Sequence, residues 1–399
     1  MINVTLRNQT DIIYGKGSVG RVGELVKAHG GSRVLLHHVS EPFVEPLLEE
    51  VRGILEAAGL SVVDLGGVVP NPRLTKVYEG IELCRKEGVD FILAVGGGSV
   101  IDSSKAIAMG VPYDGDVWDF FLMKNVHKAA LPVGVISTFA ATGSECTTGT
   151  VVTKEDESLK RGVEDNNDHV MLRPRFAILD PTLTFTAPRF QTASGTADII
   201  SHICENYFSN DPDNDFSDHF CAAGLKTAIK FGPVVLQDPQ NYEARGALML
   251  LSGFAINGYM KFGRHGDWNC HALEHEMSGE WDIPHGAGLA IITPHWMRAI
   301  YQEHLPIFLK FATEVFQIPY DAEDPEATAL KGIEALEEVF FKKLGLPRTL
   351  RALGISEEQL TDEVLHRVCN RIFYYGTDVV GDFHPMREED FFEILKQSV

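Results

Sequence analysis

The sequence lacks the features that mark membrane-spanning, secreted and thiolate-metal proteins. It contains no run of about 18 apolar residues, so we expect no membrane-spanning helix. Residues 1–15 hold no charged segment followed by an apolar stretch, so we expect no secretory signal and a cytoplasmic location. The six cysteines form no C-x-x-C pair, which argues against a thiolate zinc site and against a disulfide framework.

Positive charge is also scarce. The 399 residues include 35 Lys and Arg against 56 Asp and Glu, a formal net charge of −21, and no Lys/Arg-rich run is present. A general nucleic-acid binder needs a basic face to neutralise phosphates, so we expect no nucleic-acid partner. The hydrophobic content of 44% and the charged content of 23% are typical of globular proteins, and the length suits two domains.

Short apolar runs alternate with amphipathic stretches in the first half of the chain. The apolar run at 90–95 is continuous, as in a strand that is buried on both faces. This alternation predicts an α/β domain with a parallel sheet. Strands are expected at 33–38, 60–65, 90–95 and 131–136, and helices at 43–58 and 75–87.

The second half has a different pattern, because strand signals fade after the apolar segment at 177–181. Pro181 and Pro188 bracket a boundary, and we place the domains at 1–185 and 186–399. Helical periodicity dominates from Thr192 onward, which predicts an all-helical second domain. The expected helices are 192–208, 216–230, 241–262, 267–278, 286–316, 327–343 and 359–375.

A glycine-rich turn, Gly96-Gly97-Gly98-Ser99, follows the expected strand at 90–95 and precedes a helical segment. Glycines let a phosphate approach the backbone amides, and the helix N-terminus behind them favours negative charge. A diphosphate is therefore the expected ligand. The turn matches neither G-x-G-x-x-G nor the P-loop pattern, so a tight turn without a ligand remains the alternative.

A second polar turn, Ser137 to Glu145, follows the expected strand at 131–136. Its hydroxyl groups would lie at the carboxyl ends of the parallel strands, where ligands of such sheets bind. The alternative is a helix-capping box in which Thr142 pairs with Glu145.

The residue pattern that bears most directly on chemistry is a set of histidines and one aspartate. Asp198 and His202 are four residues apart, as are His271 and His275, so each pair shares one face of a helix. His285 lies between Pro284 and Gly286 at an expected helix boundary. Carboxylate and imidazole ligands suit Fe(II) or Zn(II), so we expect one divalent metal.

A rival motif overlaps this segment. His271-Ala272-Leu273-Glu274-His275 matches the H-x-x-E-H pattern of inverted zinc proteases. In that interpretation His271 and His275 bind zinc and Glu274 is the general base. It leaves Asp198, His202, His285 and the glycine-rich turn without a role.

Together these motifs resemble the iron-containing (group III) alcohol dehydrogenase family, in its branch of butanol dehydrogenases and broad-range aldehyde reductases. The resemblance runs essentially from end to end and rests on several short segments. They are Tyr14-Gly15-Lys16-Gly17, Pro70-Asn71-Pro72, Gly96 to Asp102, Ala141-Thr142-Gly143-Ser144-Glu145, Asp180-Pro181, Asp267-Trp268 and Pro284-His285-Gly286.

The resemblance implies an N-terminal Rossmann-like domain followed by a helical, metal-binding domain. It implies a metal held by Asp198, His202, His271 and His285, with His275 as the catalytic histidine near the nicotinamide and substrate; a purely structural role is the alternative for His275. It also implies a set of residues that bind NAD(H) or NADP(H). These are Gly97, Gly98 and Ser99 at the diphosphate, Asp102, Thr138, Thr142 and Lys160 along the cofactor groove, and Leu179 near the adenine.

The implied reaction is reversible hydride transfer between the nicotinamide and a primary alcohol or aldehyde, by a homodimer. The segment after residues 33–38 carries Glu41 and Glu45 and lacks the lysines that accept a 2′-phosphate in the aldehyde reductases, which favours NAD(H) slightly. Three alternatives remain open. They are polyol oxidation as in glycerol dehydrogenase, dehydroquinate synthase chemistry, for which the segment 255–300 offers few basic residues, and a non-catalytic nucleotide- and metal-binding protein.

Overall fold

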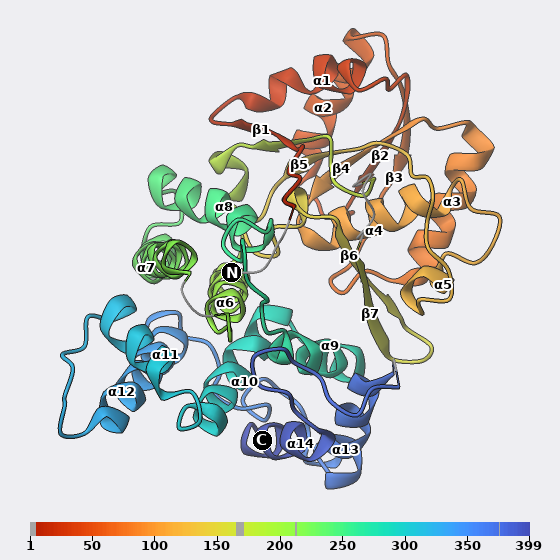
Figure 1. Ribbon diagram of the computed structural model, residues 1–399. Helices are drawn as coiled ribbons and strands as arrows, with labels where there is room; N and C mark the ends of the chain where they lie inside the picture. The colour runs from red at the N-terminus through yellow and green to blue at the C-terminus, as the bar shows by residue number, and fades with distance from the viewer. Residues whose placement is uncertain (1–4, 165–170, 212–213, 375) are drawn as a thin grey trace. The chain divides into compact units, whose positions relative to one another are not determined.

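The computed structural model describes residues 5–164, 171–211, 214–374 and 376–399. The chain forms two compact units (Figure 1). One is Arg7–Ala187, and the other is Pro188–Val399 together with Thr5 and Leu6. The domain bounds predicted from the sequence, 1–185 and 186–399, stay a prediction.

Six parallel strands form the sheet of the first unit, in the order β1–β8–β5–β4–β2–β3. The strands predicted at 33–38, 60–65, 90–95 and 131–136 are all present, so the predicted parallel sheet is confirmed. The bounds are β1 (Asp11–Tyr14), β2 (Arg33–His38), β3 (Ser61–Leu65), β4 (Phe91–Gly96), β5 (Val133–Ser137) and β8 (Phe176–Leu179).

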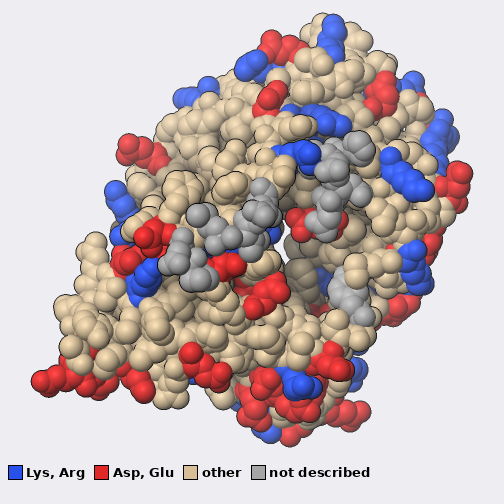
Figure 2. All heavy atoms as spheres, in the orientation of Figure 1, with Lys and Arg blue, Asp and Glu red and all other residues tan. Residues whose placement is uncertain are grey.

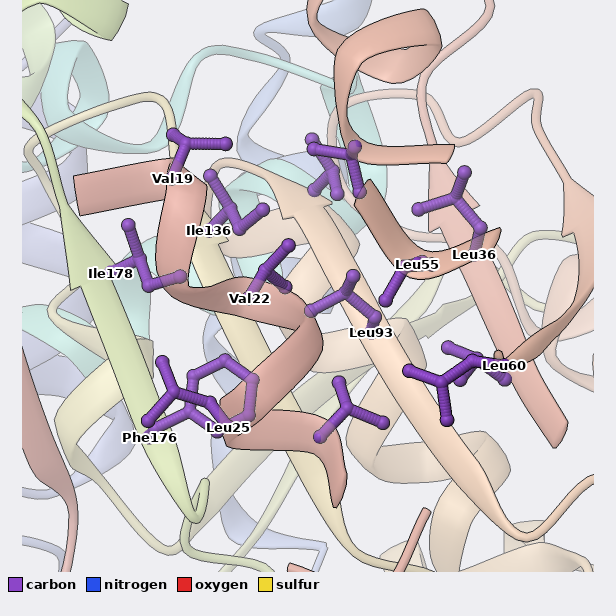
Figure 3. Close-up of a cluster of buried hydrophobic side chains, with 14 of the residues drawn as sticks. Val19, Val22, Leu25, Leu36, Leu55, Leu60, Leu93, Ile136, Phe176 and Ile178 are labelled. Carbon is purple, nitrogen blue, oxygen red and sulfur yellow. The ribbon is translucent and has the colours of Figure 1, made fainter. Parts of the chain in front are cut away.

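Successive strand residues point to opposite faces of the sheet, and in the central strands both sets are apolar. Helices therefore cover both faces. On one face, α1 (Val22–Ala28) and α2 (Glu45–Ala57) pack over Leu36, Leu93 and Ile136 (Figure 3). On the other face lie α3 (Leu74–Glu87) and α4 (Gly98–Gly110). These two helices approach closely, since a Cβ on Gly80 would clash with Ile107.

An antiparallel ribbon of β6 (Gly149–Lys154) and β7 (Leu159–Glu164) completes the ordered strands of this unit, beside a short helix, α5 (Trp118–Phe121). The β6–β7 ribbon was not predicted from the sequence. Its strands carry polar and charged residues such as Lys160 and Arg161, so they show no apolar run. Both of these side chains are nevertheless buried.

The described part of the second unit is helical apart from a single β-bridge between Val380 and Met386. The predicted fold, an α/β domain followed by an all-helical one, is confirmed. The helices are α6 (Arg189–Tyr207), α7 (Asp215–Gln237), α8 (Tyr242–Ile256), α9 (Asn269–Trp281), α10 (His285–Ile300), α11 (Leu305–Lys310), α12 (Pro325–Glu337), α13 (Asp362–Asn370) and α14 (Glu388–Gln397).

The helices expected at 241–262, 286–316 and 359–375 are shorter than expected, the last being α13 (Asp362–Asn370), and α14 was not predicted. The helix expected at 286–316 breaks after Ile300 and restarts at Leu305, where Pro306 occupies the first turn of α11 and cannot continue a preceding helix. The helix expected at 241–262 ends at Ile256, and Gly258 follows with a φ of 97°, a left-handed conformation that favours glycine.

The surface carries both signs of charge without a basic stripe on the face in Figure 2. Acidic side chains gather beside α12, where Asp321, Glu323 and Asp324 are exposed. Within the described residues, no helix combines the length and the apolar character needed to cross a membrane.

Candidate active site

Four predicted metal ligands come together inside the helical unit. Asp198 and His202 lie one turn apart on α6, His271 lies in the first turn of α9, and His285 is the first residue of α10. Their nitrogens surround one carboxylate oxygen, Asp198 Oδ1. His202 Nδ1 lies 3.5 Å from it, His285 Nε2 3.6 Å and His271 Nε2 3.8 Å.

These distances fit donor atoms around a shared cation better than direct hydrogen bonds. Separations of 3.5 to 3.8 Å are too long for a good N–H···O bond. Donor atoms around a tetrahedral ion with bonds of about 2.1 Å lie about 3.4 Å apart. Asp198 Oδ1, His202 Nδ1 and His271 Nε2 are buried and have no hydrogen-bond partner among the described residues. Unsatisfied buried atoms are costly, so the residues present fit a divalent metal.

The electrostatics of the cluster are dominated by burial and by the charges facing one another. Burial alone would raise the pKa of the Asp198 carboxyl, but the surrounding imidazoles outweigh it and hold that pKa well below its usual range. Burial lowers the pKa of His202 to about 3. For His271 burial acts in the same direction, but Glu205 and Asp198 outweigh it and raise the pKa to about 10.

A close helix crossing brings His285 to Asp198. Pro284 caps the N-terminus of α10, and Gly286 follows His285 in the first turn. A Cβ at Gly286 would clash with the Ser194 carbonyl oxygen of α6 and lie 3.2 Å from Asp198 Cβ. Only glycine lets the two helix backbones come this near.

His275 lies beside the cluster, one turn after His271 on α9. Its ring centroid is 6.2 Å from that of His271 and 5.5 Å from that of His285. It is partly exposed, whereas Asp198, His202 and His271 are buried. His275 is therefore placed next to the ligand set and retains access to solvent.

Two glutamates in the cluster were missed as partners of the ligands. Glu205 contacts His271 Nδ1, and Glu274 contacts His285 Nδ1. A signal for Glu205 was present in the sequence, because it lies three residues after His202 and so shares its helix face. Glu274 was considered only as a protease base. Its carboxylate is occupied by His285, which argues against the H-x-x-E-H interpretation.

The predicted cofactor residues gather at the carboxyl edge of the sheet in the first unit. After β2 the chain moves to β3 on one side, and after β4 it moves to β5 on the other, so β2 and β4 flank a topological switch point. Ligands of open α/β sheets bind outside such points. The glycine-rich turn lies here, with Gly97 capping the N-terminus of α4.

The second polar turn packs directly on the glycine-rich turn. Thr138 N donates to Gly96 O at 3.1 Å, and a Cβ on Gly98 would lie 2.5 Å from Thr142 Oγ1. Thr142 Oγ1 accepts a hydrogen bond from Ser144 N at 3.2 Å. The alternative of a capping box from Thr142 to Glu145 is wrong, because the short helix at 144–146 is capped by Gly143 without a side-chain bond.

Asp102 and Lys105 of α4 fasten the second turn and the ribbon. The Asp102 carboxylate accepts from Ser144 Oγ at 2.5 Å and from Val151 N at 3.2 Å. The buried Lys105 ammonium donates to the carbonyl oxygens of Ser144 at 2.6 Å and Gly149 at 2.8 Å. Lys105 was not predicted as a site residue, because it belongs to no recognisable sequence motif.

Of the remaining predicted cofactor residues, Ser99 ends the glycine-rich turn, whereas Lys160 and Leu179 lie further along the chain. Ser99 is in the first turn of α4, and Lys160 is buried on β7 opposite Thr153. Leu179 ends β8 and is buried; β5 separates this strand from β4. All three belong to the same unit as the glycine-rich turn.

Two family models match the chain, one over each half. A family model described as iron-containing alcohol dehydrogenase matches residues 9–181. A second, described as the C-terminal part of the Fe-containing alcohol dehydrogenase family, matches residues 192–399. The chain belongs to the iron-containing alcohol dehydrogenase family. The predicted resemblance is confirmed, and so is the prediction of an NAD(P)-linked alcohol dehydrogenase or aldehyde reductase.

Individual members of this alcohol dehydrogenase family match over the whole chain. A probable NADH-dependent butanol dehydrogenase 2 of Bacillus subtilis (strain 168) is 39% identical, covering 100% of both chains. An NADPH-dependent aldehyde reductase of Escherichia coli (strain K12) is 31% identical over 97% of each. The crystal structure of NADH-dependent butanol dehydrogenase A from Thermotoga maritima matches with a TM-score of 0.93 and 36% identity, covering 100% of this chain and 99% of that one.

Proposed function

We propose that this alcohol dehydrogenase interconverts small primary alcohols, of the size of butanol, and their aldehydes with NADH. The observation that carries the proposal is the set of three imidazole nitrogens within 3.8 Å of Asp198 Oδ1. Asp198, His202, His271 and His285 would hold one divalent metal, Fe(II) or Zn(II). The relatives named as butanol dehydrogenases and aldehyde reductase support the substrate class.

The roles of the residues follow from their positions. A divalent ion in the cluster would act as a Lewis acid on the substrate oxygen. His275, partly exposed beside the ligands, would exchange a proton with that oxygen as alcohol and aldehyde interconvert, because an imidazole titrates near neutral pH. The metal-binding role would belong to residues 186–399 and the nucleotide-binding role to residues 1–185. In the latter, Gly97, Gly98 and Ser99 would bind the diphosphate, and Asp102, Thr138, Thr142, Lys160 and Leu179 would line the groove.

A preference for NADH over NADPH is supported by the charges after β2. Glu41 is exposed in the loop at the switch point, and Glu45 begins α2. Both would repel a 2′-phosphate in this position. A Glu41→Lys variant should raise kcat/KM for NADPH relative to that for NADH. No change in this ratio would count against the placement of the adenosine at this loop.

We also propose a homodimer located in the cytoplasm. Support for self-association comes from β1, which forms the edge of the sheet and exposes Ile12 and Tyr14 by 45% and 43%. Exposed apolar edge strands readily pair with another chain. Light scattering of the purified protein tests this, and a monomer at micromolar concentration would contradict it.

The central test is anaerobic purification with metal analysis, followed by oxidation of NADH with a panel of aldehydes. We expect about one metal ion per chain and turnover with butanal. His271→Ala should lose both. Full turnover by a metal-free His271→Ala protein would overturn the proposed function.

A further inference from the structure

Two of the three proposed ligand histidines each contact a buried glutamate through Nδ1, the ring nitrogen that points away from Asp198. Glu205 Oε2 contacts His271 Nδ1, and Glu274 Oε2 contacts His285 Nδ1. In both histidines the opposite nitrogen, Nε2, faces Asp198 Oδ1. Glu205 is 2% exposed and Glu274 is 0% exposed, so neither carboxylate is available to bulk solvent.

Glu274 is held in place by groups on α9 and α10. The Ser278 hydroxyl, one turn later on α9, donates to Glu274 Oε1. On α10, Gly288 leaves the room that the carboxylate occupies, because a Cβ there would lie 3.0 Å from both Cγ and Oε1 of Glu274. The Glu274 carboxylate is therefore held in one position between α9 and α10.

Glu205 is fixed in a different way. Its Oε1 accepts a hydrogen bond from the backbone N–H of His271 at 3.0 Å, while Oε2 contacts the ring of the same residue. Glu205 thus orients both the ring of His271 and the first turn of α9. A substitution of Glu205 would disturb the helix as well as the ring, which makes Glu274 the cleaner residue to test.

A carboxylate behind an imidazole has two effects on the nitrogen in front. It keeps the proton on Nδ1, so that the Nε2 lone pair is free for a metal, and it increases the basicity of that nitrogen. It also fixes the plane of the ring. Here the two glutamates add their negative charges to that of Asp198 in a buried site, which opposes loss of a divalent cation.

We propose that Glu205 and Glu274 are positioning residues that set how tightly the site holds its metal, with Glu274 acting through His285. This inference rests on the proposed metal site. It assigns Glu274 no contact with substrate or cofactor. The glutamate holds a ligand, whereas the H-x-x-E-H interpretation would have it activate water.

The test is the affinity for Zn²⁺, measured by competition with a chromophoric chelator for the wild-type protein and Glu274→Gln. The substitution keeps the size of the side chain and removes its charge. We expect the dissociation constant to rise about 10- to 100-fold and the ion to leave faster. Turnover of Glu274→Gln should recover toward the wild-type kcat when Zn²⁺ is supplied in excess, because the ligands themselves are intact.

Glu280→Gln is the matched control. Glu280 lies on the same helix, but its carboxylate pairs with Arg367 at 2.6 Å and Arg371 at 2.7 Å instead of a ligand histidine. Its Zn²⁺ affinity should equal that of the wild type. An unchanged dissociation constant in Glu274→Gln, or an equal loss in Glu280→Gln, would overturn the proposal.

Ser278→Ala provides a second variant if Glu274→Gln does not fold. It removes the hydroxyl that donates to Glu274 and, at 3.3 Å, to Ile283 O. Because the Glu274 charge remains, Zn²⁺ binding should weaken by a smaller factor, on the order of 3-fold. Unchanged affinity in this variant would also count against the proposal. A wild-type protein that binds no stoichiometric metal would contradict the proposed function, and is thereby distinguishable from a failure of this inference.

Discussion

His37 and His202 are both buried, but they differ in whether their ring nitrogens have hydrogen-bond partners. Burial lowers the pKa of His37 to about 4 and that of His202 to about 3. His37 Nδ1 lies 2.8 Å from Leu65 O, and its Nε2 lies 2.7 Å from Ser103 Oγ, so both nitrogens are satisfied. His202 Nδ1 has no hydrogen-bond partner in the part of the chain that the structure describes, and it faces Asp198. The first is a structural histidine, and the second has a nitrogen available to a metal.

His37 should make the fold sensitive to mild acid. The unfolded chain binds a proton at the ordinary pKa of 6.5, whereas the folded protein resists it until about pH 4. Stability is therefore complete above pH 6.5 and falls as the pH drops toward 4, by up to about 3 kcal/mol. His38 and Lys76, the nearby basic groups, act in the same direction. Urea unfolding at pH 7.0 and 5.0 measures the change.

The quantity to compare between variants is the change in unfolding free energy with pH, because a substitution can also shift the absolute stability. His37→Gln removes one titrating ring and should reduce the dependence of stability on pH between pH 7 and 5. His219→Gln changes an exposed histidine and should leave the wild-type slope. Equal slopes in all three proteins would show that His37 does not contribute.

Asp198→Asn should separate charge from shape at the metal cluster. The amide has nearly the same size but cannot supply the negative charge that the three imidazoles surround. We expect metal affinity and kcat/KM to fall by about 100-fold or more. Metal content after dialysis and NADH-linked reduction of butanal measure both. The control is Asp211→Asn, whose carboxylate contacts the exposed His265 at 3.0 Å. Metal retention by Asp198→Asn at the wild-type level would contradict the ligand assignment.

Residue spacing and resemblance predicted Asp198, His202, His271 and His285 as one set, and the structure brings them together. Spacing works for Asp198 and His202 because one helix fixes their relation. It could not place Glu274 behind His285, since that contact depends on how α9 meets α10. Lys105 was invisible for a similar reason, because its partners lie about forty residues further along the chain.

At the scale of elements, the site depends on how closely α10 crosses α6. Gly286→Ala should push these helices apart, because its Cβ would clash with the Ser194 carbonyl, which is backbone and cannot swing away. We expect a loss of about 1–3 kcal/mol in unfolding free energy. We also expect weaker Zn²⁺ binding, since His285 precedes this residue. Chemical unfolding and chelator competition test the two effects.

Gly53→Ala is the control for this substitution. Gly53 is an exposed residue within α2, and a Cβ there would meet nothing within 4 Å. This change should be neutral or stabilise the protein by up to about 1 kcal/mol, because alanine favours helix. If Gly286→Ala behaves like Gly53→Ala, the close crossing is not what holds His285 in place.

Helices and strands could be predicted where the hydrophobic pattern was continuous. They were missed where a proline or buried charged residues interrupted that pattern. The buried strand β4 stood out as a continuous apolar run. The break between α10 and α11 was missed because apolar residues resume directly after the polar segment 301–304, while Pro306 forces a new start. The β6–β7 ribbon was missed because Lys160 and Arg161 are buried through contacts that only the folded chain provides.

At the scale of the whole molecule, the proposed cofactor residues and the proposed ligands belong to different compact units. Gly97, Asp102 and Thr142 lie in Arg7–Ala187, whereas Asp198, His271 and His285 lie in Pro188–Val399. Each group is held by hydrogen bonds within its own unit, such as Ser144 to Asp102 and His271 to Glu205. Cofactor binding and metal binding should therefore be separable by experiment.

Removal of the metal with a chelator should abolish turnover and leave NADH binding nearly intact. Without the ion, the substrate oxygen loses its Lewis acid, and we expect kcat to fall by about 100-fold or more. The dissociation constant of NADH, measured by titration calorimetry on the same metal-free sample, should change by less than about 3-fold, because the residues proposed to bind it keep all their contacts. Zn²⁺ or Fe²⁺ should restore turnover. Loss of NADH affinity in parallel with the metal would mean that the ion also organises the cofactor site, and the division of roles between the two units would then be wrong.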